Sequence, residues 1–410
     1  ESAQPTGEWP SQWPPLLQRI HAARGSQDAG AAMPRLAGLL PPDGMHGLQA
    51  AVTLLQDAIA RDARILVVGD FDCDGATACA VGVRGLRMLG ARQVLHAVPN
   101  RIVHGYGLTP GLVEELAALQ PDLVVTVDHG IACHAGIAAA KARGWQVLVT
   151  DHHLPGDTLP AADAIVDPNQ AGDAFPCKAL AGVGVMFYVL LALRARLGVQ
   201  ADLTSLLDLV AVGTVADMVP LDANNRALVG AGMRRLRAGQ GCAGLRALIE
   251  AAKRREAVLT TADIGYAVGP RINAAGRLED MGIGIECLLT DDPARARDLA
   301  AVLQAINEER RGVQQQMTDD AEAALAQLSG SEAAACLFDP DWHPGVVGLV
   351  ASKLKERLHR PAIAFAPAEP GSATLRGSAR SIPGFHIRDA LALVDARHPG
   401  LIPRFGGHAM

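Results

Sequence analysis

The sequence lacks the cysteine patterns and the long apolar runs of several large protein classes. Its seven cysteines are scattered and include no C-x-x-C pair, which argues against a structural zinc site or a disulfide framework and favours a reducing, cytoplasmic location. The longest uncharged apolar stretch, Ala179 to Leu193, is shorter than the ~20 residues that a membrane span requires. We therefore expect a buried helix there and no membrane partner.

Common nucleotide-binding and hydrolase signatures are absent too. There is no G-x-x-x-x-G-K-[ST] phosphate loop and no G-x-S-x-G nucleophile turn. The pair Gly182 and Gly184 lacks the third glycine of a dinucleotide fingerprint and precedes a hydrophobic helix. Close helix packing is the better interpretation of these two glycines.

Aromatic residues and net positive charge are both scarce. Aromatics are 3% of the chain, so its core must be built from Ala, Val, Leu and Ile, and the net charge of −6 is unusual for a nucleic-acid binder. Either the substrate is not a polyanion, or local basic patches and bound metals make the charge positive at the substrate-binding surface. Residues 231–255 favour the second interpretation, although a solvated helix face remains the alternative. Their basic residues, set against the single acid Glu250, are Arg234, Arg235, Arg237, Arg246, Lys253, Arg254 and Arg255.

What the sequence does contain is a regular alternation of strand and helix patterns after residue 46. Short apolar runs alternate with helical stretches, which predicts a parallel, doubly wound α/β sheet. The expected strands are Arg64–Gly69, Gln93–Val98, Asp122–Val127, Gln146–Thr150 and Ala164–Val166. The expected helices between them are Ala76–Leu89, Pro110–Leu119 and His134–Arg143.

The 410 residues are too many for one hydrophobic core, so several domains are expected. We expect a proline-rich arm over residues 1–45, an α/β domain over 46–220, a helical connector over 221–330 and a smaller α/β domain over 331–410. A long helix over Glu308–Leu328 would link the two α/β domains. In the second of them we expect strands at Ala335–Phe338 and Ala362–Phe365 around the helix Val346–Leu358.

Acidic and histidine side chains follow the predicted strands of the larger domain. In open parallel sheets ligands bind beyond the carboxyl ends of the strands, so these side chains should face one crevice. We assign a fourth cluster, Asp217 in GTVADMVP, to the same strand ends. The clustered residues are Asp70, Asp72, Asp74, Asp128, Asp151, His152, His153 and Asp217.

So many like charges in one crevice would repel one another unless a cation lies between them. Carboxylates with some imidazole suit Mg²⁺ or Mn²⁺, and two such ions form the clamp used in phosphoryl displacement. Each cluster alone has a plainer explanation, because Asp-rich turns after strands are common and Asp217 could cap a helix. Together they favour a metal site.

At this point the motifs resemble those of a known family. GDFDCDG, VDHG, TDHH and GTVADMVPL, in this order, are similar to the metal motifs of the DHH phosphoesterase superfamily. PNR followed by HGYGL, then GPRINAAGRL, HPGVVG, GSARS and GGH, resemble its RecJ branch over roughly residues 45 to 410. The resemblance implies a DHH catalytic domain, a helical connector and a DHHA1 domain across a cleft.

The resemblance also implies roles for the clustered residues. Two Mn²⁺ or Mg²⁺ ions would be bound, one by Asp70, Asp72 and Asp128, the other by Asp74, Asp128, His152 and Asp217. Asp128 would bridge the ions, Asp151 would orient a histidine, and His153 would contact the scissile phosphate. Superfamily members often have a histidine where this chain has Val68, so Asp70 would replace it as a ligand.

The activity implied is 5′→3′ hydrolysis of single-stranded DNA to 5′-mononucleotides, in DNA repair and recombination. Arg101, Ser378 and Arg380 match positions of a 5′-phosphate pocket. Weaker candidates for contacts with the strand behind it are Arg271, Asn273, Arg277 and His408, for which interdomain salt bridges or capping are the alternative. The rival functions are hydrolysis of oligoribonucleotides or cyclic dinucleotides, and a non-catalytic RecJ-like binding protein.

The partners implied are single-stranded DNA, a single-stranded-DNA-binding protein and a helicase. RecJ proteins usually continue beyond the Gly-Gly-His motif into the rest of DHHA1 and an OB-fold, whereas this chain ends at Met410 and starts at Glu1 rather than Met. We therefore expect a fragment with an incomplete DHHA1 domain. Its binding to DNA should be salt-sensitive and about micromolar or weaker, as in non-specific binding.

Overall fold

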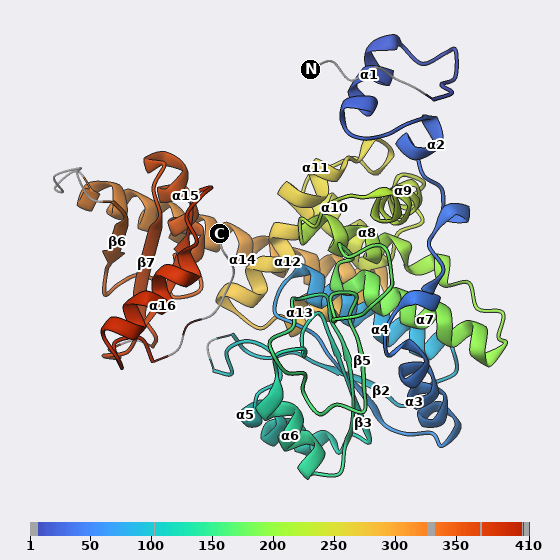
Figure 1. The fold of residues 1–410 in the computed structure, drawn as a ribbon, viewed down its shortest axis with the longest axis horizontal. Helices are drawn as coiled ribbons and strands as arrows, with labels where there is room; N and C mark the ends of the chain where they lie inside the picture. Colours follow the sequence, from blue (N-terminus) through green and yellow to red (C-terminus); the bar gives the residue numbers. More distant parts are fainter. Residues whose placement is uncertain (1–6, 102, 326–332, 370, 404, 406–409) are drawn as a thin grey trace. The chain divides into compact units, whose positions relative to one another are not determined.

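The computed structural model describes residues 7–101, 103–325, 333–369, 371–403, 405 and 410. The chain divides into two compact units, Glu1–Gln304 and Ala305–Met410, and the division falls inside one long helix (Figure 1). Each unit has its own sheet, so each is described by itself. Among the described residues no helix combines the length and apolar character needed to cross a membrane.

The larger unit contains the predicted doubly wound sheet. Its five strands are all parallel and lie in the order β2-β1-β3-β4-β5. They are β1 (Ile65–Val68), β2 (Val94–Ala97), β3 (Leu123–Val127), β4 (Gln146–Thr150) and β5 (Ala164–Val166). Every residue of β1 and β3 is buried, which explains why these strands are continuous apolar runs rather than alternating ones.

Helices cover both faces of this sheet (Figure 1). Successive residues of β1 point to opposite faces, so Ile65 and Val67 join one apolar cluster and Leu66 and Val68 join the other. The larger cluster includes residues of α3 (Leu48–Ala60), α4 (Cys73–Met88), α7 (Gly182–Leu197) and α8 (Leu207–Ala216). The smaller includes residues of α5 (Pro110–Leu116) and α6 (His134–Ala142).

The region after the sheet is mainly helical, as predicted. It includes α9 (Ala223–Arg237), α10 (Ala243–Ala251), α12 (Gly269–Leu278), α13 (Gly282–Leu289) and α14 (Pro293–Leu325). A short π-helix, η6 (Ile264–Val268), directly precedes α12. The long helix α14 begins at Pro293, earlier than the predicted Glu308, because Pro is well suited to the first turn of a helix and neither Pro nor Gly follows before Glu308.

The smaller unit has a three-stranded sheet in the order β6-β7-β8. The strand β6 (Ala335–Phe338) is parallel to β7 (Ala362–Pro367), whereas β8 (Leu375–Arg380) is antiparallel to β7. The helix α15 (Val347–Leu358) was predicted, whereas β8 and α16 (Ile387–Arg397) were not. The sequence LRGSAR has no fully buried position and no β-branched residue, so β8 carries no local strand signal.

Candidate metal centre

The acidic and histidine residues lie where the order of the parallel strands reverses direction. From β1 the chain moves outward to β2 and then returns to β3 on the other side of β1. This switch point opens a crevice at the carboxyl ends of the strands. Asp70–Asp74 follow β1, Asp128 follows β3, and Asp151–His153 follow β4. The expected convergence of three strand ends is therefore observed.

Asp217 reaches the site in a different way from the one predicted. It is the C-terminal capping residue of α8, so a helix rather than a strand brings the fourth acid to the crevice. The next residue, Met218, has a φ of 63°, which ends the helix abruptly. The assignment of Asp217 to a strand end was wrong because GTVADMVP continues the apolar helix α8.

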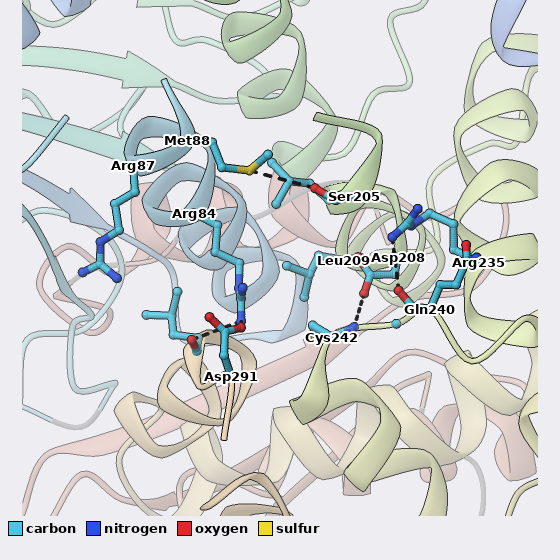
Figure 2. A pocket seen from close by; sticks show the side chains of 13 residues that line it. Arg84, Arg87, Met88, Ser205, Asp208, Leu209, Arg235, Gln240, Cys242 and Asp291 are labelled. Atoms are coloured by element: carbon cyan, nitrogen blue, oxygen red, sulfur yellow. Dashed lines mark hydrogen bonds and ion pairs between the residues drawn. The ribbon is translucent and has the colours of Figure 1, made fainter. Parts of the chain in front are cut away.

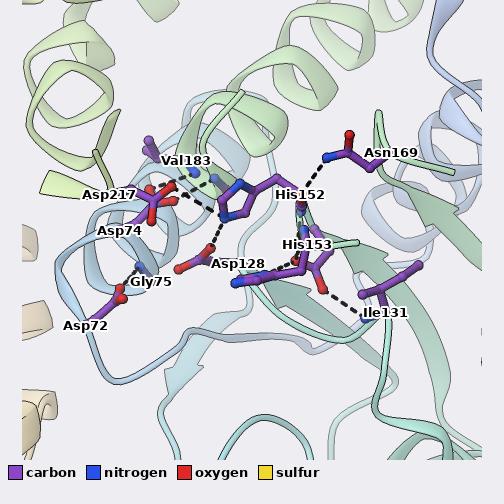
Figure 3. Close-up of polar contacts among 12 residues, drawn as sticks. Asp72, Asp74, Gly75, Asp128, Ile131, His152, His153, Asn169, Val183 and Asp217 are labelled. Carbon is purple, nitrogen blue, oxygen red and sulfur yellow. Dashed lines mark hydrogen bonds and ion pairs between the residues drawn. The ribbon is translucent and has the colours of Figure 1, made fainter. Parts of the chain in front are cut away.

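Three groups of side chains bring their ligand atoms within 4.8 Å of one another. Figure 3 shows the two groups that contain His152. The groups are Asp70 with Asp72 and Asp128, Asp74 with His152 and Asp217, and Asp128 with His152 and His153. His152 Nε2 lies 3.1 Å from Asp128 Oδ1 and 3.6 Å from Asp217 Oδ2. Asp128 and His152 each occur in two groups, so the three groups form one continuous centre.

Three carboxylates of this centre are almost completely removed from solvent, whereas Asp72 and Asp217 are partly exposed. Asp70, Asp74 and Asp128 are each at most 3% exposed. Burial, reinforced by Asp72, raises the pKa of Asp70 to about 8. Burial and the neighbouring acids also raise the pKa of Asp74 and of Asp128 well above the ordinary value. Asp70 Oδ1 is buried and has no hydrogen-bond partner among the described residues. Buried, mutually repelling oxygens of this kind fit divalent cations that prefer oxygen with some imidazole.

Asp128 is held in an unusual backbone conformation. Its φ of 64° lies in the left-handed region, which is costly for a non-glycine residue and is found mainly at functional sites. Its backbone N–H donates to Thr150 O at 3.0 Å, which ties it to the end of β4. A Cβ atom at Gly182 would lie 2.5 Å from Asp128 Cβ, so only glycine allows α7 to begin this close. The surrounding structure therefore fixes the position of the Asp128 carboxylate.

Helix N-termini orient two of the other acids. Asp72 caps α4 and accepts a hydrogen bond from Gly75 N at 3.0 Å, so α4 begins at Cys73 rather than at the predicted Ala76. Asp74 accepts from Gly182 N at 2.6 Å and from Val183 N at 3.1 Å, at the start of α7. These bonds leave each carboxylate with one defined orientation toward the crevice.

Asp151 is fully buried and orients the ring of His153, whereas from His152 it accepts only the backbone N–H, at 2.8 Å. It accepts hydrogen bonds from Ile131 N at 2.9 Å and from His153 Nδ1 at 2.8 Å. Burial opposes ionisation of Asp151, but His153 and the backbone donors outweigh it and hold its pKa at about 2. Burial alone would lower the pKa of His153, but the same Asp151 contact raises it to about 9. His153 is thus held as a positively charged donor beside the acidic cluster.

Sequence reasoning assigned no role to two further residues that contact this centre. Tyr106 Oη lies 3.4 Å from Asp128 O and 3.4 Å from the ring nitrogens of His153. Asn169, in the loop after β5, donates from Nδ2 to His152 O at 2.6 Å. Tyr106 belongs to the HGYGL motif and Asn169 follows a fourth strand end, so both positions carried a signal that could have been used.

The candidate 5′-phosphate residues occur in both units. In the larger unit the Arg101 guanidinium stacks 4.0 Å from the ring centre of Phe71, which lies between Asp70 and Asp72. In the smaller unit Arg380 donates to Ser378 Oγ at 3.0 Å and to Ser352 Oγ at 3.1 Å. Arg101 therefore lies beside the acidic loop, and Ser378 and Arg380 form one cluster on β8.

The remaining substrate candidates are placed differently from one another. Asn273 accepts a hydrogen bond at 2.8 Å from the backbone N–H of Cys73, which lies in the acidic loop between Asp72 and Asp74. The buried Arg271 donates to Gln304 Oε1 at 2.6 Å and to Ala267 O, which favours a structural role over contact with a DNA strand. Arg277 lies in the last turn of α12, half-buried, and His408 falls outside the described residues.

The basic segment 231–255 is helical and partly engaged within the protein. Arg246 pairs with Glu256 and Arg254 pairs with Asp263, while Arg237 donates to Leu259 O. Arg234, Lys253 and Arg255 are exposed. Contacts within the protein therefore account for part of this segment, and Arg234, Lys253 and Arg255 stay candidates for either a basic patch or a solvated helix face.

A separate pocket of about 370 Å³ lies beside this segment (Figure 2). Its arginines are bonded to the protein itself: Arg84 to Leu288 O and Asp291, Arg87 to Val94 O, and Arg235 to Gln240 O. The arginines of this pocket therefore have structural roles, and none of the residues that line it belongs to the metal centre.

Comparisons with known proteins agree with this site. The DHH family, N-terminal domain, matches residues 64–214, and the DHHA1 domain matches residues 329–410. The chain is 50% identical to the single-stranded-DNA-specific exonuclease RecJ of Dickeya dadantii (strain 3937), over 98% of this chain and 72% of that protein. It is 49% identical to the protein of the same name in Escherichia coli (strain K12), over 99% of this chain and 72% of that one.

Two solved structures are also similar. RecJ from Thermus thermophilus in complex with Mn²⁺ has a TM-score of 0.81 and 36% identity, and the match covers 96% of this chain but only 55% of that one. A manganese-bound exonuclease RecJ has a TM-score of 0.76 and 37% identity, covering 91% of this chain and 90% of that one. The chain belongs to the RecJ family, with a DHH domain and a DHHA1 domain.

Proposed function

We propose that this chain is a divalent-metal-dependent exonuclease that hydrolyses single-stranded DNA from its 5′ end and releases 5′-mononucleotides, in DNA repair and recombination. The observation that carries the proposal is the buried, continuous centre in which Asp128 and His152 are shared between ligand groups. The relatives named single-stranded-DNA-specific exonuclease RecJ, and the RecJ structures with Mn²⁺ or Mg²⁺, support it.

The residues of the centre divide into two ligand sets. Asp70, Asp72 and Asp128 would hold one Mn²⁺ or Mg²⁺ ion. The second ion would be held by Asp74, Asp128, His152 and Asp217. When bound, such a pair of ions supplies the Lewis acidity that activates water and neutralises charge on the phosphate.

His153 would then act on the scissile phosphate. Its hydrogen bond to Asp151 fixes the ring and raises its pKa to about 9, so the ring carries a proton at neutral pH. A charged donor stabilises the negative charge that develops on a phosphate oxygen more strongly than a neutral donor does. Asn169 holds the backbone of the adjacent His152, and so supports both histidines.

Direction would come from recognition of the terminal phosphate. The fork of donors on an arginine suits a phosphate, so Arg101 in the larger unit, and separately Ser378 with Arg380 in the smaller unit, are each proposed as a contact for the 5′-phosphate. The exposed Arg234, Lys253 and Arg255 would attract the backbone of the strand, and the shortage of aromatic residues implies binding that tolerates any sequence. A single-stranded-DNA-binding protein and a helicase remain the proposed protein partners, and the cytoplasm the proposed location.

The experiment compares substrates in parallel at fixed Mn²⁺. A long single-stranded DNA labelled at either end, a dinucleotide and a cyclic dinucleotide would each be incubated with the protein. We expect 5′-labelled mononucleotides to leave first and the two short substrates to be poor. Release from the 3′ end first, or faster cleavage of the cyclic dinucleotide, would contradict the proposal. Undiminished activity in EDTA would exclude the metal mechanism.

A further inference from the structure

The helix α12 contacts the acidic loop at the residue between two proposed metal ligands. Asn273 Oδ1 accepts a hydrogen bond from Cys73 N at 2.8 Å, although the two residues are 200 positions apart. Cys73 lies between Asp72 and Asp74, whose carboxylates belong to different ligand groups. The bond therefore fixes the loop backbone between Asp72, which belongs to one ligand group, and Asp74, which belongs to another.

This contact also completes the N-terminus of α4. The first backbone N–H groups of a helix have no partner within the helix. Asp72 accepts a hydrogen bond from Gly75 N, and Asn273 accepts one from Cys73 N. Cys73 is the first residue of α4. The loop thus depends on α12 for a hydrogen bond that its own residues do not provide.

A second contact from the same face of α12 touches the loop two residues earlier. A Cβ atom at Gly276 would lie 1.9 Å from Phe71 O, so the helix backbone packs directly against this carbonyl. Asn273 and Gly276 are three residues apart, and therefore lie on one side of the helix. Their partners, Phe71 and Cys73, are the two neighbours of Asp72. The two contacts consequently fix the backbone on both sides of that acid.

The helix α12 is itself anchored away from the loop. Arg271 is 8% exposed and donates to Gln304 Oε1, on α14, at 2.6 Å. It also donates to Ala267 O in the preceding π-helix. Because both sides of α12 are fixed, the helix can act as a rigid support.

We propose that α12 is a brace that sets the spacing of the metal ligands, and that Asn273 is a positioning residue of the metal centre rather than a contact to DNA. The inference rests on the proposed metal-dependent function. Loss of the Asn273 bond should leave the loop free to move Asp70 and Asp72 relative to Asp128, while the start of α7 still holds Asp74. The main consequence should be weaker metal binding, with little effect on the affinity for DNA.

The test measures Mn²⁺ binding to the full chain without DNA, by titration with electron paramagnetic resonance detection. Asn273→Ala and the near-isosteric Asn273→Leu both remove the acceptor, and Asn273→Leu keeps the volume if the smaller side chain prevents folding. We expect Mn²⁺ affinity to fall by about 10- to 100-fold, as for other residues that orient ligands. On single-stranded DNA, kcat at limiting Mn²⁺ should fall while KM stays within about 2-fold.

The conservative variant Asn273→Asp keeps an oxygen that can accept from Cys73 N, so it should return Mn²⁺ affinity to near the wild-type value. The control variant is Tyr266→Phe, in the π-helix that precedes α12, where the side chain is 80% exposed, and it should leave Mn²⁺ affinity unchanged. Unchanged Mn²⁺ affinity in both Asn273→Ala and Asn273→Leu would contradict the proposal that α12 is a brace. A rise in KM would then show that Asn273 contacts DNA, and a fall in melting temperature alone would show a role only in folding.

Failure of the proposed function would look different. If the wild-type protein binds Mn²⁺ but leaves single-stranded DNA intact, the proposed exonuclease activity fails. The brace would still stand in that case, provided that Asn273→Ala and Asn273→Leu weaken Mn²⁺ binding.

Discussion

The two polar clusters of this protein are built on opposite principles. In the larger unit Asp70, Asp74 and Asp128 are at most 3% exposed, and repel one another at the carboxyl ends of the parallel strands. In the smaller unit Ser378 and Arg380 lie half-buried on the outer strand β8, and bond to each other at 3.0 Å. The first cluster therefore needs a cation to be stable as an ionised set, whereas the second is stable alone and presents positive charge for an anion.

The largest expected effect comes from removing the shared carboxylate of the buried cluster. Asp128→Asn should lower Mn²⁺-dependent release of nucleotides by about 10³-fold or more, beyond the 10- to 100-fold typical of residues that only orient ligands. Asn tolerates the left-handed φ of 64°, so the fold should survive, as circular dichroism would report. The matched control is Asp57→Asn, on the exposed side of α3. Equal activity of the two variants would remove Asp128 from the centre.

Adding or removing Mn²⁺ should change the stability of the structure around the buried acidic cluster and leave that around Ser378 and Arg380 unchanged. Mn²⁺ at 1,000 times its dissociation constant should stabilise the protein by about 4 kcal/mol for each ion bound. Hydrogen exchange should then slow at the ends of β1 and β3 and stay unchanged in β7 and β8. In EDTA, Asp128→Asn should melt above the wild type, because one of several repelling charges is gone. Protection of β8 by Mn²⁺ would contradict the comparison.

The half-buried cluster of Ser378 and Arg380 should affect the choice of substrate and not the binding of metal. Arg380→Lys keeps the charge but loses the fork of donors. The preference for 5′-phosphorylated over 5′-hydroxyl oligonucleotides should fall by about 10-fold, since a hydrogen bond to a charged group contributes roughly 1.5–3 kcal/mol. The control Arg388→Lys, on the exposed side of α16, should behave as wild type. A loss of Mn²⁺ affinity in Arg380→Lys would show that the clusters are not independent in function.

The smallest effect should come from Tyr106→Phe. The hydroxyl is 3.4 Å from His153 and from Asp128 O, which is long for a hydrogen bond from a hydroxyl, and the Phe71–Tyr106 ring contact at 6.0 Å would be kept. We expect kcat to fall by no more than about 3-fold, because weak hydrogen bonds contribute at the lower end of about 0.5–1.5 kcal/mol. A loss above 10-fold in single-turnover measurements would mean that the hydroxyl contacts the substrate.

Local patterns were enough to predict the larger sheet and the residues that surround its crevice. The strands β1, β3 and β4 are largely apolar because helices cover both faces, and such runs are visible without any knowledge of partners. The rule that ligands bind beyond the carboxyl ends of parallel strands then brings Asp70, Asp128 and His152 together. The strand β8 was not predicted, because half-buried outer positions need no apolar pattern.

The sequence by itself determined the parallel sheet, the kinds of ligand at its edge and the resemblance to RecJ, because each depends on residues close together in the chain. Only the tertiary structure decided that a helix delivers Asp217, that Asp151 holds His153, and that Asn273 binds the loop at Cys73. The left-handed backbone of Asp128 belongs to the same class, since it needs the glycine at 182 to make room. These features depend on atoms brought together from distant parts of the chain, and no periodicity or spacing records which distant residue fills a given hydrogen bond.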